Sequence, residues 1–298
     1  MKKIIYLLIL IFVISGCSFN DETVDDNGNN SNNSTNDSTN NNQSPDEGNL
    51  DENDKEFMIS TLIPNSYSIS GQTITFTKAG EYTVSGTFNG SLVFKVDTAE
   101  SVTLYLDNAK IVSTDNHAMY WMNDTGKIEI KAIEKTSNEI IVSSHSTNLY
   151  SAIESNNNIE IGGSGKLVIK GLQRHAIKGS NIEVKGNVDL TIEAVKDGLH
   201  GKQVLFTGGN TKINNCTDAI QVEKNSNNLK GTITVEEGIL EISNCKRAFR
   251  AESSVTIKQL IGCTLIINVN GVEELYECAN FNYVDGTFLV NGSSYKKK

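Results

Sequence analysis

The stretch Lys196-Asp197-Gly198-Leu199-His200-Gly201-Lys202 contains a short pattern that recurs along the chain: a polar residue, a small one, an apolar one and another polar one. The small positions of the copies are Ala118, Ala152, Ala176, Gly198, Ala219 and Ala248. Successive copies lie 34, 24, 22, 21 and 29 residues apart. A recurrence of this length is typical of repeat folds, in which each unit packs against its neighbours.

Two more short apolar runs follow each copy, as Ile182-Glu183-Val184 and Leu190-Thr191-Ile192 follow the copy at Ala176. Three strands in a turn of roughly 22 residues predict an all-β chain folded as a parallel β-helix, with turns one strand spacing, about 4.8 Å, apart. An antiparallel sandwich or barrel would place hairpin dipeptides between the runs. Asn89-Gly90 and Asp285-Gly286 do occur, but near the ends of the repeat region, and through 150–269 the period is three strands, not two, so the β-helix is favoured.

The two longest gaps predict loops, which we place at Ser143–Asn148 and Lys224–Asn228. We expect residues 67–112 to form the opening turns. Residues 271–295 are expected to form a terminal cap, because the open edge of a solenoid would otherwise pair with another chain.

The N-terminus has the pattern of an export signal. Lys2 and Lys3 precede an apolar run from Ile4 to Ile14, and Ser15-Gly16-Cys17 follows. The run is shorter than the about 20 residues of a membrane-spanning helix. Ile14-Ser15-Gly16-Cys17 resembles the bacterial lipobox, where cleavage leaves a lipid-modified cysteine at the new N-terminus. We therefore expect residues 1–17 to be a lipoprotein signal peptide with lipidation at Cys17; an ordinary signal peptide with a chance cysteine is the alternative.

Residues 18–56 are rich in Asn, Ser, Asp and Thr and offer almost no apolar side chains to offset the entropy of ordering. We interpret them as a disordered tether between the lipid and a folded domain at 57–298. The tether carries eleven acids and one lysine, Lys55, so its net charge is −10, equal to that of the whole chain. With two lysines in the signal, the folded domain has a net charge of only about −2. The acidic balance therefore gives no information about what the domain binds.

Stacked repeats convert sequence register into columns of side chains. The residue after the small position should point inward and the next one outward. Two carboxylates, Asp197 and Asp218, then lie about one turn apart on one face. Seven basic side chains flank them in neighbouring columns: Arg174, Lys178, Lys196, His200, Lys246, Arg247 and Arg250. Such cations hold carboxylates of a ligand by charge-assisted hydrogen bonds.

Two phrases of the chain, residues 74–86 and the stretch 196–202, resemble a family of bacterial surface carbohydrate-binding domains. The likeness covers about 70–270. It implies a right-handed parallel β-helix related in shape to pectate lyases, with calcium held by aspartates of successive turns and an acidic plant polysaccharide as ligand. By this resemblance Asp197 and Asp218 would bind calcium. In the other four copies of the repeat, the position of these aspartates is held by His117, Ser151, His175 and Arg247. The alternative to a calcium site is that both aspartates accept backbone N–H bonds at turns.

These observations predict a lipoprotein on the extracellular face of the cell membrane that binds polysaccharide, of a polyuronate or pectin-like kind, without catalysis. We expect a monomer with no nucleic-acid partner. One alternative is a polysaccharide lyase, for which Arg174, Lys178 or Arg247 could serve as the base. The other is a structural or adhesive surface protein with no sugar ligand.

Histidines and cysteines give weaker signals. His175 and His200 lie on adjacent turns but in different columns, so we do not expect them to share a zinc ion. Cys216 and Cys245 each lie three residues before a small position, on consecutive turns. That stacking allows either a disulfide, since export permits oxidation, or a pair of buried free thiols, which we favour slightly.

Overall fold

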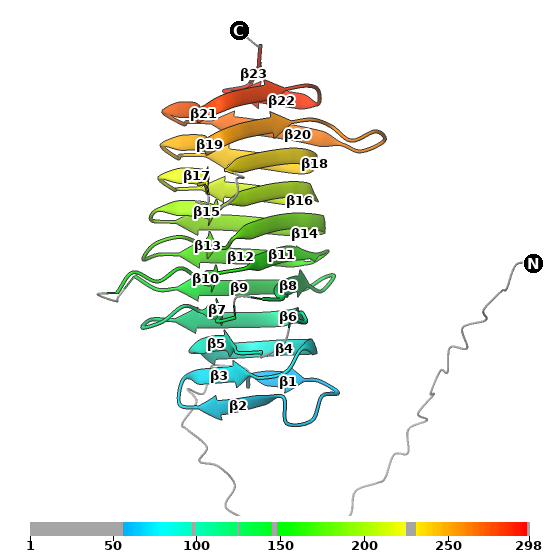
Figure 1. Ribbon diagram of the computed structural model, residues 1–298, viewed down its shortest axis with the longest axis vertical. Coiled ribbons are helices and arrows are strands. Elements are labelled where there is room, and N and C mark those ends of the chain that lie inside the picture. Colours follow the sequence, from blue (N-terminus) through cyan, green and yellow to red (C-terminus); the bar gives the residue numbers. More distant parts are fainter. Residues whose placement is uncertain (1–55, 97–98, 124, 145–147, 225–230, 297–298) are drawn as a thin grey trace, which may run out of the picture. The chain divides into compact units, whose positions relative to one another are not determined.

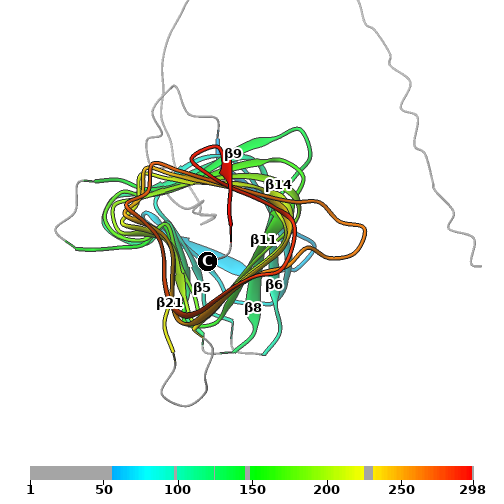
Figure 2. The ribbon, with the colours of Figure 1, turned by 90° about the horizontal axis from the view of Figure 1, so that it is seen from above.

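The computed structural model describes residues 56–96, 99–123, 125–144, 148–224 and 231–296. Within these ranges the regular elements are all strands, and they stack turn upon turn as a right-handed parallel β-helix (Figure 1). Viewed down the stack, three faces surround a closed core (Figure 2). The predicted fold class is therefore confirmed.

The repeat identified in the sequence forms one of these faces, which we call the repeat face. Its strands pair in parallel, in this order: β3 (Thr73–Phe76), β5 (Ser91–Phe94), β7 (Met119–Trp121), β10 (Ile153–Ser155), β13 (Ile177–Lys178), β15 (Asp197–Gly201), β17 (Asp218–Val222), and the first parts of β19 (Arg247–Ile257) and β21 (Glu274–Tyr283).

Longer strands bend around a corner and contribute to both other faces. They are β4 (Gly80–Asn89), β6 (Val102–Ser113), β14 (Asn181–Ala194), β16 (Gln203–Asn214) and β18 (Thr232–Ser243). The second face is completed by β8 (Lys127–Ala132), β11 (Asn158–Gly163) and the last parts of β19 and β21. The third is completed by β9 (Ser137–Val142), β12 (Lys166–Gly171), β20 (Leu265–Asn270) and β22 (Thr287–Val290). The pairing register shifts at this corner, for example between Gly186 and Asp189.

The predicted register of the repeat is confirmed. Ile177 pairs with Ile153 on one side and with Leu199 on the other, one turn away in each direction. The register also extends further than the sequence pattern did, to Leu92 in β5 and Tyr276 in β21. All six predicted small residues lie in the interior. A Cβ atom on Gly198 would come within 2.7 Å of the Ala219 carbonyl oxygen, which explains why large side chains are excluded there.

A second corner, between the third face and the repeat face, repeats an unusual backbone conformation. Asn215, Asn244 and Gly271 occupy this corner in three consecutive turns, with φ of 56°, 55° and 61°. Asparagine and glycine tolerate this left-handed conformation better than other residues. The Asn215 N–H donates to the Ser243 carbonyl one turn away, so the corner is also part of the stack.

The core is a continuous column of inward side chains. On the repeat face Phe76 and Phe94 stack with ring centroids 4.8 Å apart, and Trp121 lies 6.1 Å beyond Phe94. All three are at most 1% exposed. Burial of each large apolar side chain stabilises the fold by about 1.5–3 kcal/mol, and each turn needs its neighbours to achieve it.

The two ends differ from the middle. At the start, β2 (Tyr67–Ser70) pairs antiparallel with β3, and β1 (Met58–Ser60) pairs antiparallel with β4. At the end we expected a cap at 271–295, but β21 and β22 pair in parallel with the preceding turn. That segment is therefore largely one more turn, and only β23 (Ser293–Ser294) folds back antiparallel on β22.

Several expectations fall on other parts of the chain. The signal peptide at 1–17, Cys17 and the tether up to residue 55 lie outside the described residues. So do 145–147 and 225–230, which make up much of the two predicted loops; the flanking strands β9 and β17 end at Val142 and Val222. Among the described residues, no helix is long and apolar enough to cross a membrane.

Candidate functional site

The repeat face carries the predicted site residues, but two columns lie differently from expectation. The residue two beyond the small position points outward as predicted and is half-buried in most turns, as with Lys178 and His200. The residue just before the small position is not on the surface: His175 and Asp197 are 0% exposed and Asp218 is 1% exposed. Simple alternation does not explain this burial, because a Cβ atom on Gly198 would meet a methyl of Ile213, so the small residue and the apolar residue after it both face the interior. Neighbouring side chains cover the residue before them, as His175 and His200 cover Asp197.

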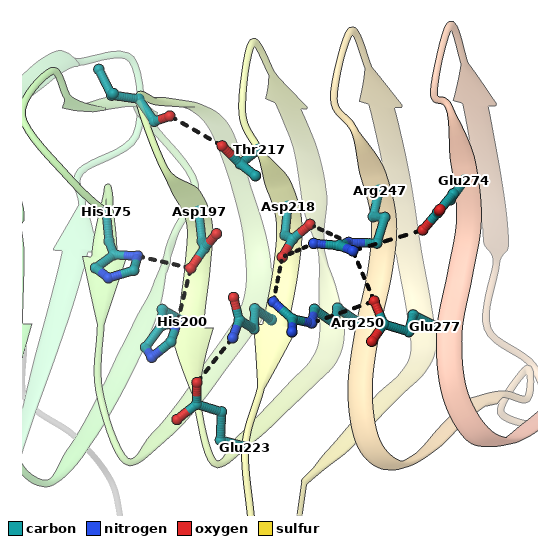
Figure 3. A network of polar contacts seen from close by, with 12 residues as sticks. His175, Asp197, His200, Thr217, Asp218, Glu223, Arg247, Arg250, Glu274 and Glu277 are labelled. Carbon is teal, nitrogen blue, oxygen red and sulfur yellow. Dashed lines mark hydrogen bonds and ion pairs between the residues drawn. The ribbon is translucent and has the colours of Figure 1, made fainter.

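Asp197 lies at the centre of a small cluster with two histidines. Its Oδ2 atom is 3.0 Å from Nδ1 of His200 in the same strand and 3.1 Å from Nδ1 of His175 one turn earlier (Figure 3). The two imidazole rings lie 4.3 Å apart between centroids. Burial alone would raise the pKa of Asp197, but the two adjacent histidines hold it well below its usual range. Burial lowers the pKa of His175.

Asp218, in the same register one turn later, has a different environment. Arg247 donates to its two carboxylate oxygens, from Nε at 2.7 Å and Nη2 at 3.3 Å, and Arg250 lies 3.4 Å from Oδ2. Both arginines also reach Glu277 of the next turn (Figure 3). The hydrogen bonds to Asp218 raise the pKa of Arg247 above its ordinary value.

The seven predicted basic residues therefore divide into groups. Arg247 and Arg250 are engaged by acids, and Lys178 is 2.6 Å from Glu154 of the preceding turn. His200 belongs to the Asp197 cluster. Among the residues that the structure describes, Arg174, Lys196 and Lys246 have no ion pair. These three line up before the repeat-face strands, where Lys196 donates its backbone N–H to the Arg174 carbonyl.

A groove opens at the opposite ends of the same strands. It has a volume of about 410 Å³ and lies between β10, β13, β15 and β17. Its lining is polar and basic: Ser155, Asn156, Lys178, Gly179, Ser180, His200, Gly201, Lys202, Glu223 and Lys224. Sequence reasoning missed Lys202 and Lys224 as site residues. A signal for Lys202 was present, because it ends the same phrase that carries Asp197 and His200.

Aromatic rings lie further down the repeat face. His117 lies 5.0 Å from both Tyr120 and Tyr150, measured between ring centroids. Tyr120 pairs in register with Glu154 of β10, and the next residue, Ser155, lines the groove, so Tyr120 lies one turn from the groove. Trp121 is buried, as its inward register predicted.

The resemblance raised calcium at Asp197 and Asp218, and the donor set can be compared with what that ion requires. Calcium takes six to eight oxygen ligands. Two arginines already occupy the Asp218 carboxylate, and imidazole nitrogens surround Asp197. The surroundings therefore do not suit calcium, which stays an untested prediction.

The four cysteines in the described part of the chain, Cys216, Cys245, Cys263 and Cys278, are all free. Cys216 and Cys245 are buried, in agreement with the favoured interpretation of a thiol pair. The hydrogen bond with the neighbouring Cys245, followed by burial, raises the pKa of the Cys216 thiol, so it stays protonated.

Comparison with known proteins agrees with this architecture. A solved structure described as the polysaccharide lyase-like protein from C. thermocellum, in a gadolinium derivative, matches with a TM-score of 0.68 and 24% identity, over 75% of this chain and 92% of that one. At this identity the likeness shows the fold alone. No curated protein matches the sequence. A family model described as "Carbohydrate-binding domain-containing protein" matches residues 70–284, and the chain therefore belongs to that family.

Proposed function

We propose that the repeat face binds an acidic polysaccharide, of a polyuronate or pectin-like kind, and that it does so without catalysis. The observation that carries this proposal is the basic groove at the ends of β13 and β15. Lys178, His200, Lys202 and Lys224 line it together with two serine hydroxyls and one asparagine amide, and Glu223 is its one acid. Cations suit uronate carboxylates, and hydroxyl and amide groups suit sugar hydroxyls.

The unpaired cations on the other side of the same strands extend the surface. Arg174 and Lys196 belong to consecutive turns, so a ligand lying along the stack would meet them about one strand spacing apart. The rings of Tyr120 and Tyr150 offer a place for a sugar to stack at the lower end of this path. We therefore expect several adjacent sugar units to contribute, each of them weakly.

The polar partners of the candidate bases argue against a lyase. A base that removes a proton needs a free lone pair near the substrate. Lys178 is held by Glu154, and Arg247 is held by Asp218 and Glu277. Arg174 remains, but a guanidinium stays protonated at ordinary pH.

The proposal places this binding domain outside the cell. Lipid on Cys17 would hold the chain to the outer face of the membrane, with residues 18–56 as the tether and a monomeric domain at the end. More than one acyl chain is needed for stable anchoring. If this is correct, the full chain enters the detergent phase on phase separation and Cys17→Ala stays in the aqueous phase.

Affinity electrophoresis of the full chain in gels containing polygalacturonate would test the sugar ligand. We expect retardation that weakens with salt, because the contacts are ionic. Lys196→Ala/Lys202→Ala should weaken binding by about 10-fold or more, since a hydrogen bond to a charged group contributes about 1.5–3 kcal/mol.

The matched control is Lys110→Ala/Lys212→Ala, which removes two charges from the third face and should leave retardation unchanged. If both double variants lost retardation equally, binding would depend on net charge alone and not on the groove. If neither charged nor neutral polysaccharides retarded the parent chain, the adhesive alternative would be favoured. The same samples, followed for the absorbance of unsaturated uronides, would reveal a lyase. Repeating the gels with calcium and with a chelator tests the calcium prediction.

A further inference from the structure

The cluster around Asp197 has buried polar atoms without partners. Both ring nitrogens of His175 and the Oδ1 atom of Asp197 are buried and make no hydrogen bond to described residues. The Nδ1 atom of His175 is 3.1 Å from the carboxylate, but the angles are not those of a hydrogen bond. Buried polar groups are almost always satisfied, so three such atoms in one cluster indicate a missing partner.

The side chains of this cluster match a metal site, in which the unpartnered Nδ1 atom of His175 would be one ligand. One ligand atom from each of His175, Asp197 and His200 lies within 4.8 Å of the other two. Ligands about 2.0–2.1 Å from a tetrahedral zinc ion are separated by about 3.4 Å. The distances of 3.0 and 3.1 Å from Asp197 Oδ2 to the two imidazoles are a few tenths of an ångström shorter, so only a small outward shift would be needed.

The chemistry of the donors selects the kind of ion. Two imidazole nitrogens and one carboxylate oxygen suit zinc and other divalent transition metals, whereas calcium and magnesium require a shell of oxygens. His175 and Asp197 are fully buried, and the side chain of His200 is 14% exposed and lines the groove. The cluster is thus closed on the core side and open on the groove side.

We propose that His175, Asp197 and His200 form a binding site for a divalent transition-metal ion, with Zn²⁺ as the reference ion. The fourth position faces the groove and takes water or another small ligand. The proposal departs from the sequence expectation that His175 and His200 do not share a zinc ion. The two columns differ in register, but both side chains lean toward the same carboxylate oxygen (Figure 3). The proposal does not depend on the ligand of the groove.

Calorimetric titration of the full, metal-stripped chain in detergent with Zn²⁺ tests the site. We expect one ion per chain, a higher unfolding midpoint with zinc, and reversal by chelator. His200→Gln removes a ligand at the surface of the cluster, and it should weaken zinc binding by at least about 100-fold while the far-ultraviolet dichroism remains that of a β-helix. Asp197→Asn should do the same.

His117→Gln is the matched control, because His117 is another half-buried histidine on the repeat face, near the carboxylate of Glu154. It should bind zinc as the parent does. Titration with Co²⁺ separates this site from the cysteines: nitrogen and oxygen ligands give only weak visible bands, whereas Cys216 or Cys245 would add intense thiolate charge-transfer absorption. Excess calcium should not displace the zinc.

Three results would overturn the proposal. One is the absence of zinc binding by the folded parent chain, which would leave a hydrogen-bonded histidine and aspartate cluster. Another is equal zinc affinity in the parent and in His200→Gln. The third is loss of binding on Cys216→Ser/Cys245→Ser with the histidine variants unaffected, which would move the site to the thiols.

Discussion

Asp197 and Asp218 begin neighbouring strands, pair with each other in register, and are both buried, yet their surroundings are opposite in kind. Two imidazoles surround the first carboxylate and two guanidinium groups surround the second (Figure 3). A buried carboxylate needs compensation in either case. Position in the repeat therefore determines that the side chain is buried, and the adjacent turns determine what it can do.

The strand phrases distinguish the two at one position only. Asp197-Gly198-Leu199-His200 and Asp218-Ala219-Ile220-Gln221 share one pattern, but the first ends in His200, which contacts Asp197. The other distinguishing partners come from the turn before, with His175, and the turn after, with Arg247. We infer that the first environment is suited to a metal ion and that the second is a structural ion-pair network, and the following substitutions test that contrast.

The largest effect is expected from removing the second carboxylate. Asp218→Ala leaves Arg247 only 13% exposed and without its nearest partner. Breaking a buried pair in this way should lower the free energy of unfolding by about 3 kcal/mol, measured by urea denaturation. Asp197→Ala, measured in the presence of chelator, should lower the free energy of unfolding by less than Asp218→Ala does, since it leaves no guanidinium unpaired.

The control for this prediction is Glu277→Ala. Glu277 contacts the same arginines but is 52% exposed, so its loss should cost less than about 1 kcal/mol. If Asp197→Ala and Asp218→Ala were equally destabilising without metal, the contrast between the two environments would have no energetic basis.

A smaller effect concerns the residue after each aspartate. Gly198→Ala would place a Cβ atom 2.7 Å from both the Ala219 carbonyl oxygen and a methyl of Ile213. Overpacking of this kind should cost about 1–3 kcal/mol in urea denaturation, and it should also weaken zinc binding by displacing Asp197. Ser180→Ala, on the groove and away from this contact, should leave both quantities unchanged. Parent-like stability of Gly198→Ala would mean that the turns are less tightly spaced than the structure has them.

Much of the fold could be predicted because the repeat is local and its spacing is regular. Alternating residues and small positions gave the three strands per turn and the register from Met119 to Phe249. The pattern was lost at the end, where Leu275 takes the position held elsewhere by a small residue and Tyr276, which pairs in register with Phe249, is 41% exposed. The last turn was therefore mistaken for a cap.

The site was harder to predict, because most of its contacts join residues 22 to 32 positions apart through side chains. Counting columns treated Asp197 and Asp218 as equivalent and His175 and His200 as separate. Column position gives the direction of a Cβ atom, but an imidazole reaches across to the next column. Column position also cannot show which cations are neutralised by an acid, as Lys178 is by Glu154.

The smallest expected effect tests a third histidine on the face, His117, which lies near a carboxylate without being in a metal-binding trio. Its Nδ1 atom is 3.0 Å from the Ser151 carbonyl and 3.7 Å from Glu154, with Lys178 and Arg174 as the nearby cations. Burial lowers the pKa of His117 below 6.5, against the opposing effect of Glu154.

A lowered histidine pKa means that the unfolded chain takes up the proton first as the pH falls. The contribution of His117 should therefore be lost as the pH falls below 6.5, by less than the limit of about 1.4 kcal/mol per pH unit for one proton. Burial would raise the pKa of Glu154, but Lys178 and His117 lower it below 4.5, so the carboxylate's contribution is lost only at lower pH. Urea denaturation between pH 7 and 5 should show a shallower decline for His117→Gln than for the parent. A steeper decline would mean that Glu154 outweighs burial, and that His117 resembles the histidines of the Asp197 cluster more closely than the structure indicates.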